Sequence, residues 1–361
     1  MIEFDAVTKR FDDGTAGVHD LTLSVPRGEV VVLVGPSGCG KTTTMRMVNR
    51  MIEPTSGTVR VDGRDVMTVD PADLRRRIGY VIQHIGLFPH RTVAENIATV
   101  PGLLGWDKRR IGARVDELLA TVGLDAAVRD RYPHQLSGGQ RQRAGVARAL
   151  AADPDIMLMD EPFGAVDPIV RGRLQAEFLR LQQQVCKTIV FVTHDIDEAI
   201  RMGDRIAIMS QGGHLEQYAT PADVLAAPAN EFVVDFLGPE RGLKRLALIP
   251  VSEAKADPGP VVRPDDDRRR AAEIAEANGT DWVVVVDAGG RLLGWVPVEE
   301  VTGRVDDATA RPFATLVRAT DSLRAALDAL VGSHTGVAVR VSDGEYYEGI
   351  ITRETLTREI M

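Results

Sequence analysis

A glycine-rich segment that contains a lysine and a threonine is the strongest chemical feature of the sequence. Residues 35–42 read Gly-Pro-Ser-Gly-Cys-Gly-Lys-Thr and match the pattern G-x-x-x-x-G-K-[ST]. Glycines let backbone N–H groups wrap around a phosphate, and a helix that starts at the lysine adds the partial positive charge of its N-terminus. In this pattern the lysine contacts the β and γ phosphates, and the threonine hydroxyl binds Mg²⁺. We therefore predict a site for a magnesium-bound nucleoside triphosphate at Gly35, Pro36, Ser37, Gly38, Cys39, Gly40, Lys41, Thr42 and Thr43.

Two other apolar runs end in side chains that suit phosphate chemistry. Ile156–Met159 is followed by Asp160 and Glu161, and Thr188–Val192 is closely followed by His194. The carboxyl ends of parallel strands gather at one edge of a sheet, which is where ligands bind. We therefore expect these groups to meet the glycine-rich loop. Asp160 would hold Mg²⁺ through water, and Glu161 would orient or deprotonate the attacking water.

Strands and helices alternate along the first 240 residues. Four apolar runs would be buried on both faces as strands, and helix-length amphipathic segments lie between them. The expected strands are Val30–Val34, Ile156–Met159, Thr188–Val192 and Arg205–Met209, and the expected helices are Lys41–Met51, Gln140–Ala152 and Val170–Gln184. This order predicts an α/β fold with a mainly parallel sheet that helices cover on both faces.

The composition is that of a soluble globular protein. Of 361 residues, 44% are hydrophobic and 26% are charged, which excludes a disordered or fibrous chain and suggests two or three domains. The net charge of −9 argues against a large nucleic-acid interface, so no nucleic-acid partner is expected. No apolar run is long enough to cross a bilayer, the first residues do not resemble a signal peptide, and two cysteines fit a reducing compartment. We therefore expect a cytoplasmic protein.

The C-terminal residues contain an internal repeat. At an offset of 55, Val262–Val301 matches Val317–Leu356 at eleven of forty positions, and the matches include strand residues and glycines. Each copy is expected to form a helix, a strand, a turn, a strand and a short helix. A unit of about 40 residues buries little core alone, so we expect the copies to pack together as one α+β module. The preceding stretch Pro239–Pro264 is rich in proline and charged residues and is interpreted as a connection.

A second glycine-containing turn indicates which class of nucleotide-binding enzyme the sequence resembles. It reads Leu-Ser-Gly-Gly-Gln at residues 136–140 and starts a helix. Together with the loop, Asp160-Glu161 and His194, it makes residues 1–240 resemble an ATP-binding-cassette (ABC) ATPase, which is a P-loop NTPase with a helical subdomain, here at about 92–152. The resemblance implies ATP and Mg²⁺ as cofactors and a homodimer that sandwiches two nucleotides.

The resemblance also implies roles for individual residues. Gln83 would contact Mg²⁺ or its water and sense the γ-phosphate, and His194 would act as a switch at the γ-phosphate. Asp167 would communicate across the dimer, and Phe11 would place its ring against adenine. The implied catalytic residues are Glu161, His194 and Gln83, and the implied metal site is Thr42, Gln83 and Asp160. Ser137 and Gly139 are implied to face the ATP bound by the second copy, and Gly138 and Gln140 are implied to be ATP-binding as well.

Several stretches resemble the ATPase subunits of quaternary-amine importers. They are Val81–His90, Glu161–Pro168, Thr193–Ala199, Pro228–Asn230 and Leu243–Leu246. Such importers take up glycine betaine, proline betaine, choline or carnitine as osmoprotectants. The resemblance implies membrane permease subunits, an extracytoplasmic substrate-binding protein or domain, and a peripheral position on the cytoplasmic face of the plasma membrane. The alternatives are an ATPase subunit of another amino-acid importer and a soluble ABC ATPase without a transport role.

The C-terminal repeat resembles a pair of CBS units. The expected boundaries are a linker at 241–260 and copies at about 261–303 and 315–361. Thr355 stands where the nucleotide-binding pattern has a ribose-binding acid, and Pro297 lacks the hydroxyl of that pattern, whereas Glu300 supplies an acid. A nucleotide ligand, a response to ionic strength at anionic lipid, and a dimerising scaffold all stay open. The basic residues suited to contact lipid are Arg263, Arg268–Arg270 and Arg318.

Overall fold

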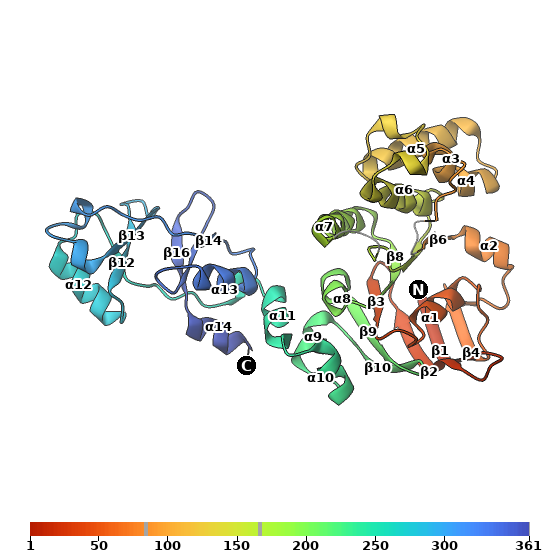
Figure 1. Cartoon of the computed structure of the whole chain (residues 1–361), viewed down its shortest axis with the longest axis horizontal. Coiled ribbons are helices and arrows are strands. Elements are labelled where there is room, and N and C mark those ends of the chain that lie inside the picture. The colour runs from red at the N-terminus through yellow and green to blue at the C-terminus, as the bar shows by residue number, and fades with distance from the viewer. Residues whose placement is uncertain (83–85, 165–167, 361) are drawn as a thin grey trace. The chain divides into compact units, whose positions relative to one another are not determined.

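The computed structural model divides the chain into two compact units. It describes residues 1–82, 86–164 and 168–360, and the units are Met1–Leu237 and Gly238–Met361 (Figure 1). Gln83 and Asp167, two of the predicted site residues, lie outside the described part of the chain. Among the described residues, no helix is long and apolar enough to span a membrane.

The first unit is built around a sheet that is parallel except at one edge. Among the described residues this sheet has six strands in the order β10-β9-β3-β8-β7-β6, and β10 runs antiparallel to β9. The strands are β3 (Val30–Val34), β6 (Ile78–Val81), β7 (Ile156–Asp160), β8 (Thr188–Thr193), β9 (Arg205–Ser210) and β10 (His214–Ala219). Every residue of β3, β7 and β8 is buried, which confirms the predicted α/β fold with its mainly parallel sheet.

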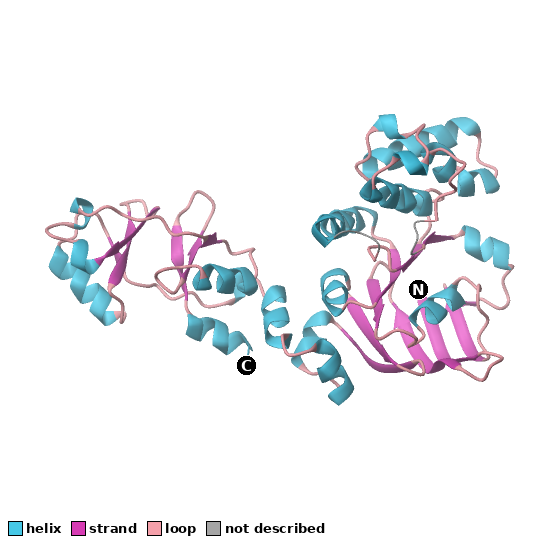
Figure 2. Cartoon of the chain, in the orientation of Figure 1, coloured by secondary structure: helices cyan, strands magenta, loops and turns pink. Residues whose placement is uncertain are grey.

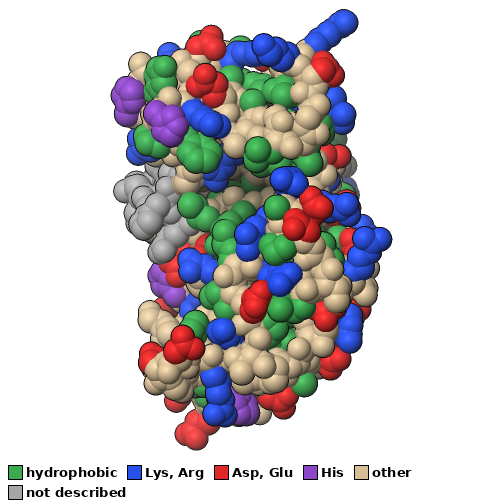
Figure 3. Space-filling model, turned by 90° about the vertical axis from the view of Figure 1, so that its right-hand side faces the viewer, with side chains coloured by type: hydrophobic (Ala, Val, Ile, Leu, Met, Phe, Trp, Pro, Cys, Tyr) green, Lys and Arg blue, Asp and Glu red, His purple; other side chains and the backbone are tan. Residues whose placement is uncertain are grey.

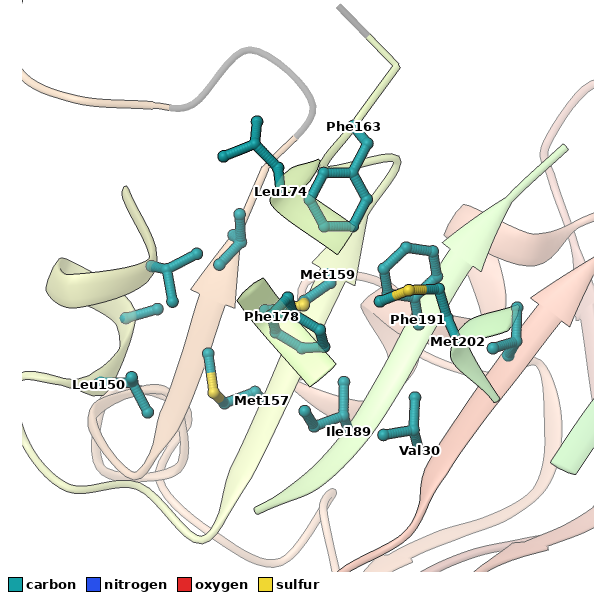
Figure 4. Packing of buried hydrophobic residues seen from close by; sticks show 14 of the residues in the cluster. Val30, Leu150, Met157, Met159, Phe163, Leu174, Phe178, Ile189, Phe191 and Met202 are labelled. Carbon is teal, nitrogen blue, oxygen red and sulfur yellow. The ribbon is translucent and has the colours of Figure 1, made fainter. Parts of the chain in front are cut away.

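Helices cover both faces of this sheet, as predicted. The residues of β3 alternate between two cores: Val32 packs in the core that contains α7 and α8, and Leu33 packs in the core that contains α1. In the first of these cores Phe178 of α7 lies beside Met159 of β7 (Figure 4). This core includes the helices α7 (Pro168–Val185), α8 (Ile196–Met202), α9 (Pro221–Ala226) and α10 (Glu231–Leu237), and α1 (Lys41–Val48) covers the opposite face.

Two further layers complete the first unit. An antiparallel sheet in the order β2-β1-β4-β5 contributes Ile2 and Phe4 to the core around α1. Its strands are β1 (Ile2–Arg10), β2 (Ala16–Val25), β4 (Ser56–Val61) and β5 (Arg64–Asp65), and α2 (Pro71–Arg76) follows them. The helical part, expected at about 92–152, contains α3 (Val93–Ile97), α4 (Thr99–Leu103), α5 (Lys108–Thr121), the 3-10 turns Ala126–Val128 and Pro133–Gln135, and α6 (Gly138–Leu150).

The second unit contains the repeat that the sequence predicts. Each copy has the order strand, helix, strand, strand and a final helical turn or helix, and each forms a three-stranded sheet within the described residues (Figure 2). The first copy has β11 (Val261–Val262), α12 (Arg268–Ala277), β12 (Trp282–Val286), β13 (Leu292–Pro297) and the turns Val298–Glu300 and Val305–Asp307. The second has β14 (Leu316–Val317), α13 (Leu323–Val331), β15 (Ala338–Val341), β16 (Tyr347–Ile351) and α14 (Arg353–Ile360).

The segment just before each copy, here called its leading segment, pairs with a strand of the other copy. Asp257, before the first copy, pairs with Ile350 of β16, and Arg311, before the second, pairs with Trp295 of β13. A Cβ on Gly294 would lie 2.4 Å from the carbonyl oxygen of Arg311, and Gly294 has a φ of 141°. The equivalent Gly349 has a φ of 132° and would bring its Cβ 2.6 Å from the oxygen of Asp257, so each copy needs glycine at the crossing.

The expected linker at 241–260 is structured instead. It contains α11 (Arg241–Leu248) and the 3-10 turn Val251–Glu253. Leu246 is fully buried and packs in one core with Leu323 and Leu356 of the second copy. The apolar stripe of α11 is narrow and lies among charged residues. Composition alone therefore indicates a linker.

Replacement of Leu246 tests whether α11 belongs to the folded second unit. Leu246→Ala should lower the free energy of unfolding of this unit by about 2–5 kcal/mol, because it leaves a cavity in the core. Urea unfolding of the full chain, followed through the fluorescence of Trp282 and Trp295 with Trp106 replaced by Phe in every variant, measures the change. Leu248→Ala is the matched control, because Leu248 lies on the same helix but is 36% exposed. Equal small effects of both variants would contradict the packing of α11.

Candidate active site

The glycine-rich loop connects β3 to α1 and holds its lysine in place. Gly35 and Gly40 have φ values of 155° and 87°. A Cβ at Gly40 would lie 1.9 Å from the carbonyl oxygen of Gly17, so only glycine fits between the loop and β2. The buried Lys41 ammonium donates hydrogen bonds to the carbonyl oxygens of Gly35 (2.8 Å) and Pro36 (2.9 Å). The loop therefore carries a fixed positive charge at the N-terminus of α1, where an anionic phosphate is favoured.

Cys39 faces the inside of this loop. It is fully buried in the core around α1, and its Sγ lies 3.5 Å from the Lys41 Nζ. This placement is that of a small packing residue.

A hydroxyl and a carboxylate meet beside the loop. The Thr42 hydroxyl donates a hydrogen bond of 3.1 Å to Asp160 Oδ1, and Arg46 Nη2 lies 3.9 Å from Asp160 Oδ2. Burial raises the pKa of Asp160, because the charged carboxylate is taken away from water. A buried carboxylate next to a hydroxyl is the kind of oxygen donor set that Mg²⁺ prefers, so Thr42 and Asp160 fit that ion.

Glu161 and His194 face each other across two neighbouring strands. Glu161 Oε1 lies 3.1 Å from His194 Nδ1, and the Glu161 N–H donates a hydrogen bond of 2.9 Å to the Val192 carbonyl oxygen. Glu161 has a φ of 43°, in the left-handed region that costs energy for a residue with a side chain. The surrounding strands hold this conformation, which directs the carboxylate toward the histidine.

Strand pairing brings these three groups to one edge. β8 pairs with β3 on one side and with β7 on the other, and Val34 is aligned with Thr193 while Asp160 is aligned with Val192. The loop after β3, the acids at the end of β7 and the histidine after β8 are therefore neighbours, although they are far apart in the sequence.

Phe11 lies close to the glycine-rich loop, because both contact Gly17. A Cβ on Gly17 would lie 2.6 Å from the Phe11 ring, and the carbonyl oxygen of Gly17 is the atom that packs against Gly40. The ring is 38% exposed, and the Lys9 ammonium lies 5.6 Å from its centre. A partly exposed aromatic ring beside the loop suits stacking on a flat base.

The Leu-Ser-Gly-Gly-Gln turn starts α6 in the helical part. The Ser137 Oγ accepts a hydrogen bond from the Gln140 N–H (3.2 Å), and the Gln140 Oε1 accepts one from the Ser137 N–H (3.0 Å). This capping box explains why serine and glutamine occur at this spacing. Ser137 and Gly138 remain exposed, so the turn presents a helix N-terminus at the surface of the unit.

Sequence reasoning missed two residues beside the site. Gly17 is the small residue that lets the Phe11 ring approach β2, and nothing in its sequence surroundings marks it. Arg46 reaches Asp160 from α1. Its position four residues after Thr42, on the same face of the helix, is a signal that was available in the sequence.

Comparison with known proteins places this geometry in a family. The model of the family described as ABC transporter matches residues 18–164, and the CBS domain model matches residues 251–307 and 305–361. The osmoprotectant import ATP-binding protein OsmV of Salmonella typhimurium is 45% identical, over 98% of this chain and 94% of its own length. The glycine betaine/carnitine/choline transport ATP-binding protein OpuCA of Bacillus subtilis is 48% identical over 83% of this chain and 79% of its own length.

A solved structure agrees with the fold of the first unit. The dimeric post-hydrolysis state of the ATP-binding cassette MJ0796, bound to ADP and Pi, superposes with a TM-score of 0.55 and 31% identity, over 61% of this chain and 99% of that one. Subunits of this kind bind and hydrolyse ATP and work as dimers with membrane permease components. The chain therefore belongs to the ABC transporter family, and within it to the ATP-binding subunits of osmoprotectant importers that carry CBS domains.

Proposed function

We propose that two copies of this chain bind two ATP molecules at the loop Gly35–Thr43 and use their hydrolysis to drive uptake of a quaternary amine. The observation that carries the proposal is the meeting of Lys41, Asp160 and the Glu161–His194 pair at adjacent strand ends. These groups supply the charge, the metal ligand and the base that phosphoryl transfer to water requires.

The residues of the site have separate tasks in this proposal. The loop N–H groups and Lys41 bind the phosphates, and Phe11 stacks on the adenine. Thr42, Asp160 and Gln83 would hold Mg²⁺, which would offset the charge of the phosphate oxygens when bound. Glu161 orients the attacking water and accepts its proton. His194, 3.1 Å from Glu161, holds that carboxylate and reports the state of the γ-phosphate.

The second half of each site comes from the other copy. Ser137 and Gly138 lie exposed at a helix N-terminus, which with Gly139 and Gln140 would face the ATP of the partner. Asp167 would communicate across the dimer. Neither copy alone surrounds the γ-phosphate, so hydrolysis follows closure of the dimer and product release reopens it.

The helical part offers a surface for the permease. Phe88, Leu103 and Leu104 are exposed, and Figure 3 shows hydrophobic side chains on the helical part, in the upper half of the view. We place the chain on the cytoplasmic face of the membrane, with permease subunits on this surface and a substrate-binding protein or domain on the other side. The names of the relatives support glycine betaine, carnitine or choline as the cargo.

The CBS pair is assigned a regulatory role. A cavity of about 550 Å³ opens between the leading segment and the end of the second copy, and Lys255, Thr352, Thr355 and Arg358 are among its lining residues. At the position equivalent to Thr355, Glu300 is paired with Arg311, whose guanidinium covers the Trp295 ring at 5.2 Å. The two halves therefore differ. The cavity is lined by Asp257 and Glu354 as well as by its two cations, so its charge does not select an anionic ligand.

Replacement of Glu161 tests its assignment as the base. Glu161→Gln should lower the ATPase rate by about 100-fold or more, because the amide cannot accept the proton, while ATP binding persists. Size-exclusion chromatography with ATP should then show a stable dimer. Glu29→Gln is the control, since Glu29 pairs with Arg205 at the opposite end of β3. Normal hydrolysis by Glu161→Gln would remove this role.

Cargo is tested with the complete transporter in liposomes. Glycine betaine, carnitine or choline should raise the ATPase rate, whereas spermidine should not, because relatives that match this chain over most of both lengths are named for osmoprotectant import and for glycine betaine/carnitine/choline transport. Stimulation by an unrelated amino acid alone would assign the chain to a different importer.

Deletion of the second unit tests the regulatory role. Removal of residues 238–361 should leave ATP hydrolysis intact and change its dependence on salt concentration, because the deletion follows the boundary between the units. Removal of 255–361 is a useful comparison, since it strips Leu246 of its packing partners and should give a less stable protein. An unchanged salt response in the first variant would contradict regulation through this unit.

A further inference from the structure

A buried hydrogen-bonded network joins α7 to the turn that carries His194. Gln175 of α7 donates from its Nε2 to Glu198 Oε1 of α8 at 2.9 Å, and both side chains are buried. Arg201 of α8 donates to the Gln175 Oε1 at 3.3 Å, so both ends of the Gln175 amide are used.

The network continues into the backbone of the turn. The Thr193 Oγ1 accepts a hydrogen bond from the Asp195 N–H at 3.1 Å, which spans His194. Asp195 in turn caps α8, because its Oδ1 accepts from the N–H groups of Asp197 (2.9 Å) and Glu198 (3.3 Å). Arg171 of α7 lies 4.0 Å from Asp195 Oδ2. The residues on both sides of His194 are therefore held by α7 and α8, whereas its own ring is 61% exposed.

We propose that Glu198 is a positioning residue, which fixes the turn Thr193–Asp195 so that the His194 imidazole faces Glu161. The inference deepens the proposed function and rests on the role assigned there to His194. The carboxylate does not reach the nucleotide edge itself. It acts through Gln175, which ties the first turn of α8 to α7. That turn is capped by Asp195, whose own N–H is held by the Thr193 Oγ1.

The chemistry of Glu198 suits this task. Burial raises its pKa, and the hydrogen bonds from Thr193 and Gln175 oppose that effect, so a carboxylate in this place depends on those donors. It is costly to leave a buried acceptor without its donors, or buried donors without their acceptor. The network therefore favours a single arrangement of the turn.

The position of Gln175 on α7 connects the network to the start of that helix. α7 begins at Pro168, directly after Asp167 in the sequence, and Gln175 lies two turns further along the helix. A displacement of α7 on dimer closure is thus transmitted to the turn of His194 through Gln175 and Glu198. This provides a route by which the dimer contact and the γ-phosphate switch are coupled.

The test uses the full chain and compares kcat with KM for ATP. Glu198→Ala and Gln175→Leu should each lower kcat by about tenfold, the change that loss of one charge-assisted hydrogen bond produces, and leave KM within about twofold. Glu198→Gln keeps the shape and one acceptor oxygen, so it should retain more activity than Glu198→Ala. If Glu198→Ala does not fold, Glu198→Gln replaces it as the test variant.

Gln182→Leu is the matched control for Gln175→Leu. Gln182 lies on the same helix, is 9% exposed against 5% for Gln175, and hydrogen-bonds the carbonyl oxygens of Gly28 and Lys187, away from the turn. Its replacement should lower the melting temperature to a similar extent without lowering kcat. Equal kcat values for Gln175→Leu and Gln182→Leu would overturn the proposal.

Combination with His194→Ala separates this inference from the proposed function. Since Glu198 acts through His194, Glu198→Gln should lower kcat much less in the His194→Ala background than in the unmodified chain. A full and additive loss would show that Glu198 acts elsewhere and would contradict the inference alone. An unchanged kcat in His194→Ala by itself would contradict the role of His194, and the inference would fall with it.

Discussion

The parallel pairing of β3, β8 and β7 is the constraint on which the site depends. These strands come from three distant parts of the sequence, and the residues of each are buried on both faces. Because they are parallel and adjacent, the glycine-rich loop, Asp160 with Glu161, and His194 leave the sheet at the same edge. The two cores that bury opposite faces of β3 hold this alignment, so the chemistry at the edge depends on packing beneath it.

This alignment supports groups that would be unfavourable elsewhere. Glu161 keeps a left-handed backbone, Asp160 is a buried acid with a raised pKa, and Lys41 is a buried cation held by carbonyl oxygens. Each of these features costs free energy in the folded protein, and the apolar strands around them offset it. Such features are common where a site must be ready for a charged ligand before that ligand arrives. The network of Glu198 extends the same rigidity to the turn of His194.

The sequence predicted the site better than it predicted the second unit. Val30–Val34 is found as β3 with the same bounds, because a short run of branched apolar residues before a glycine-rich loop has few alternatives. The structure also brings Thr42 to Asp160 and Glu161 to His194, as convergence of strand ends requires. In contrast, the sequence predicts a linker where the structure has α11, since the charges of this helix outnumber its buried positions. The crossing of the leading segments depends on pairing between the copies, which the sequence of either copy alone does not show. Gly17 was missed because only the packed structure shows what lies against it, and the roles of Gln83 and Asp167 stay predictions.

The central claim is that each ATP is hydrolysed between two copies of the chain. The most direct measurement is the ATPase rate per subunit of the isolated full chain as a function of protein concentration, together with the molar mass from light scattering. If Ser137 of one copy completes the site of the other, the rate per subunit should be very low where the chain is monomeric and should rise as dimers form. A constant rate per subunit, maintained at concentrations where only monomers are present, would contradict the account.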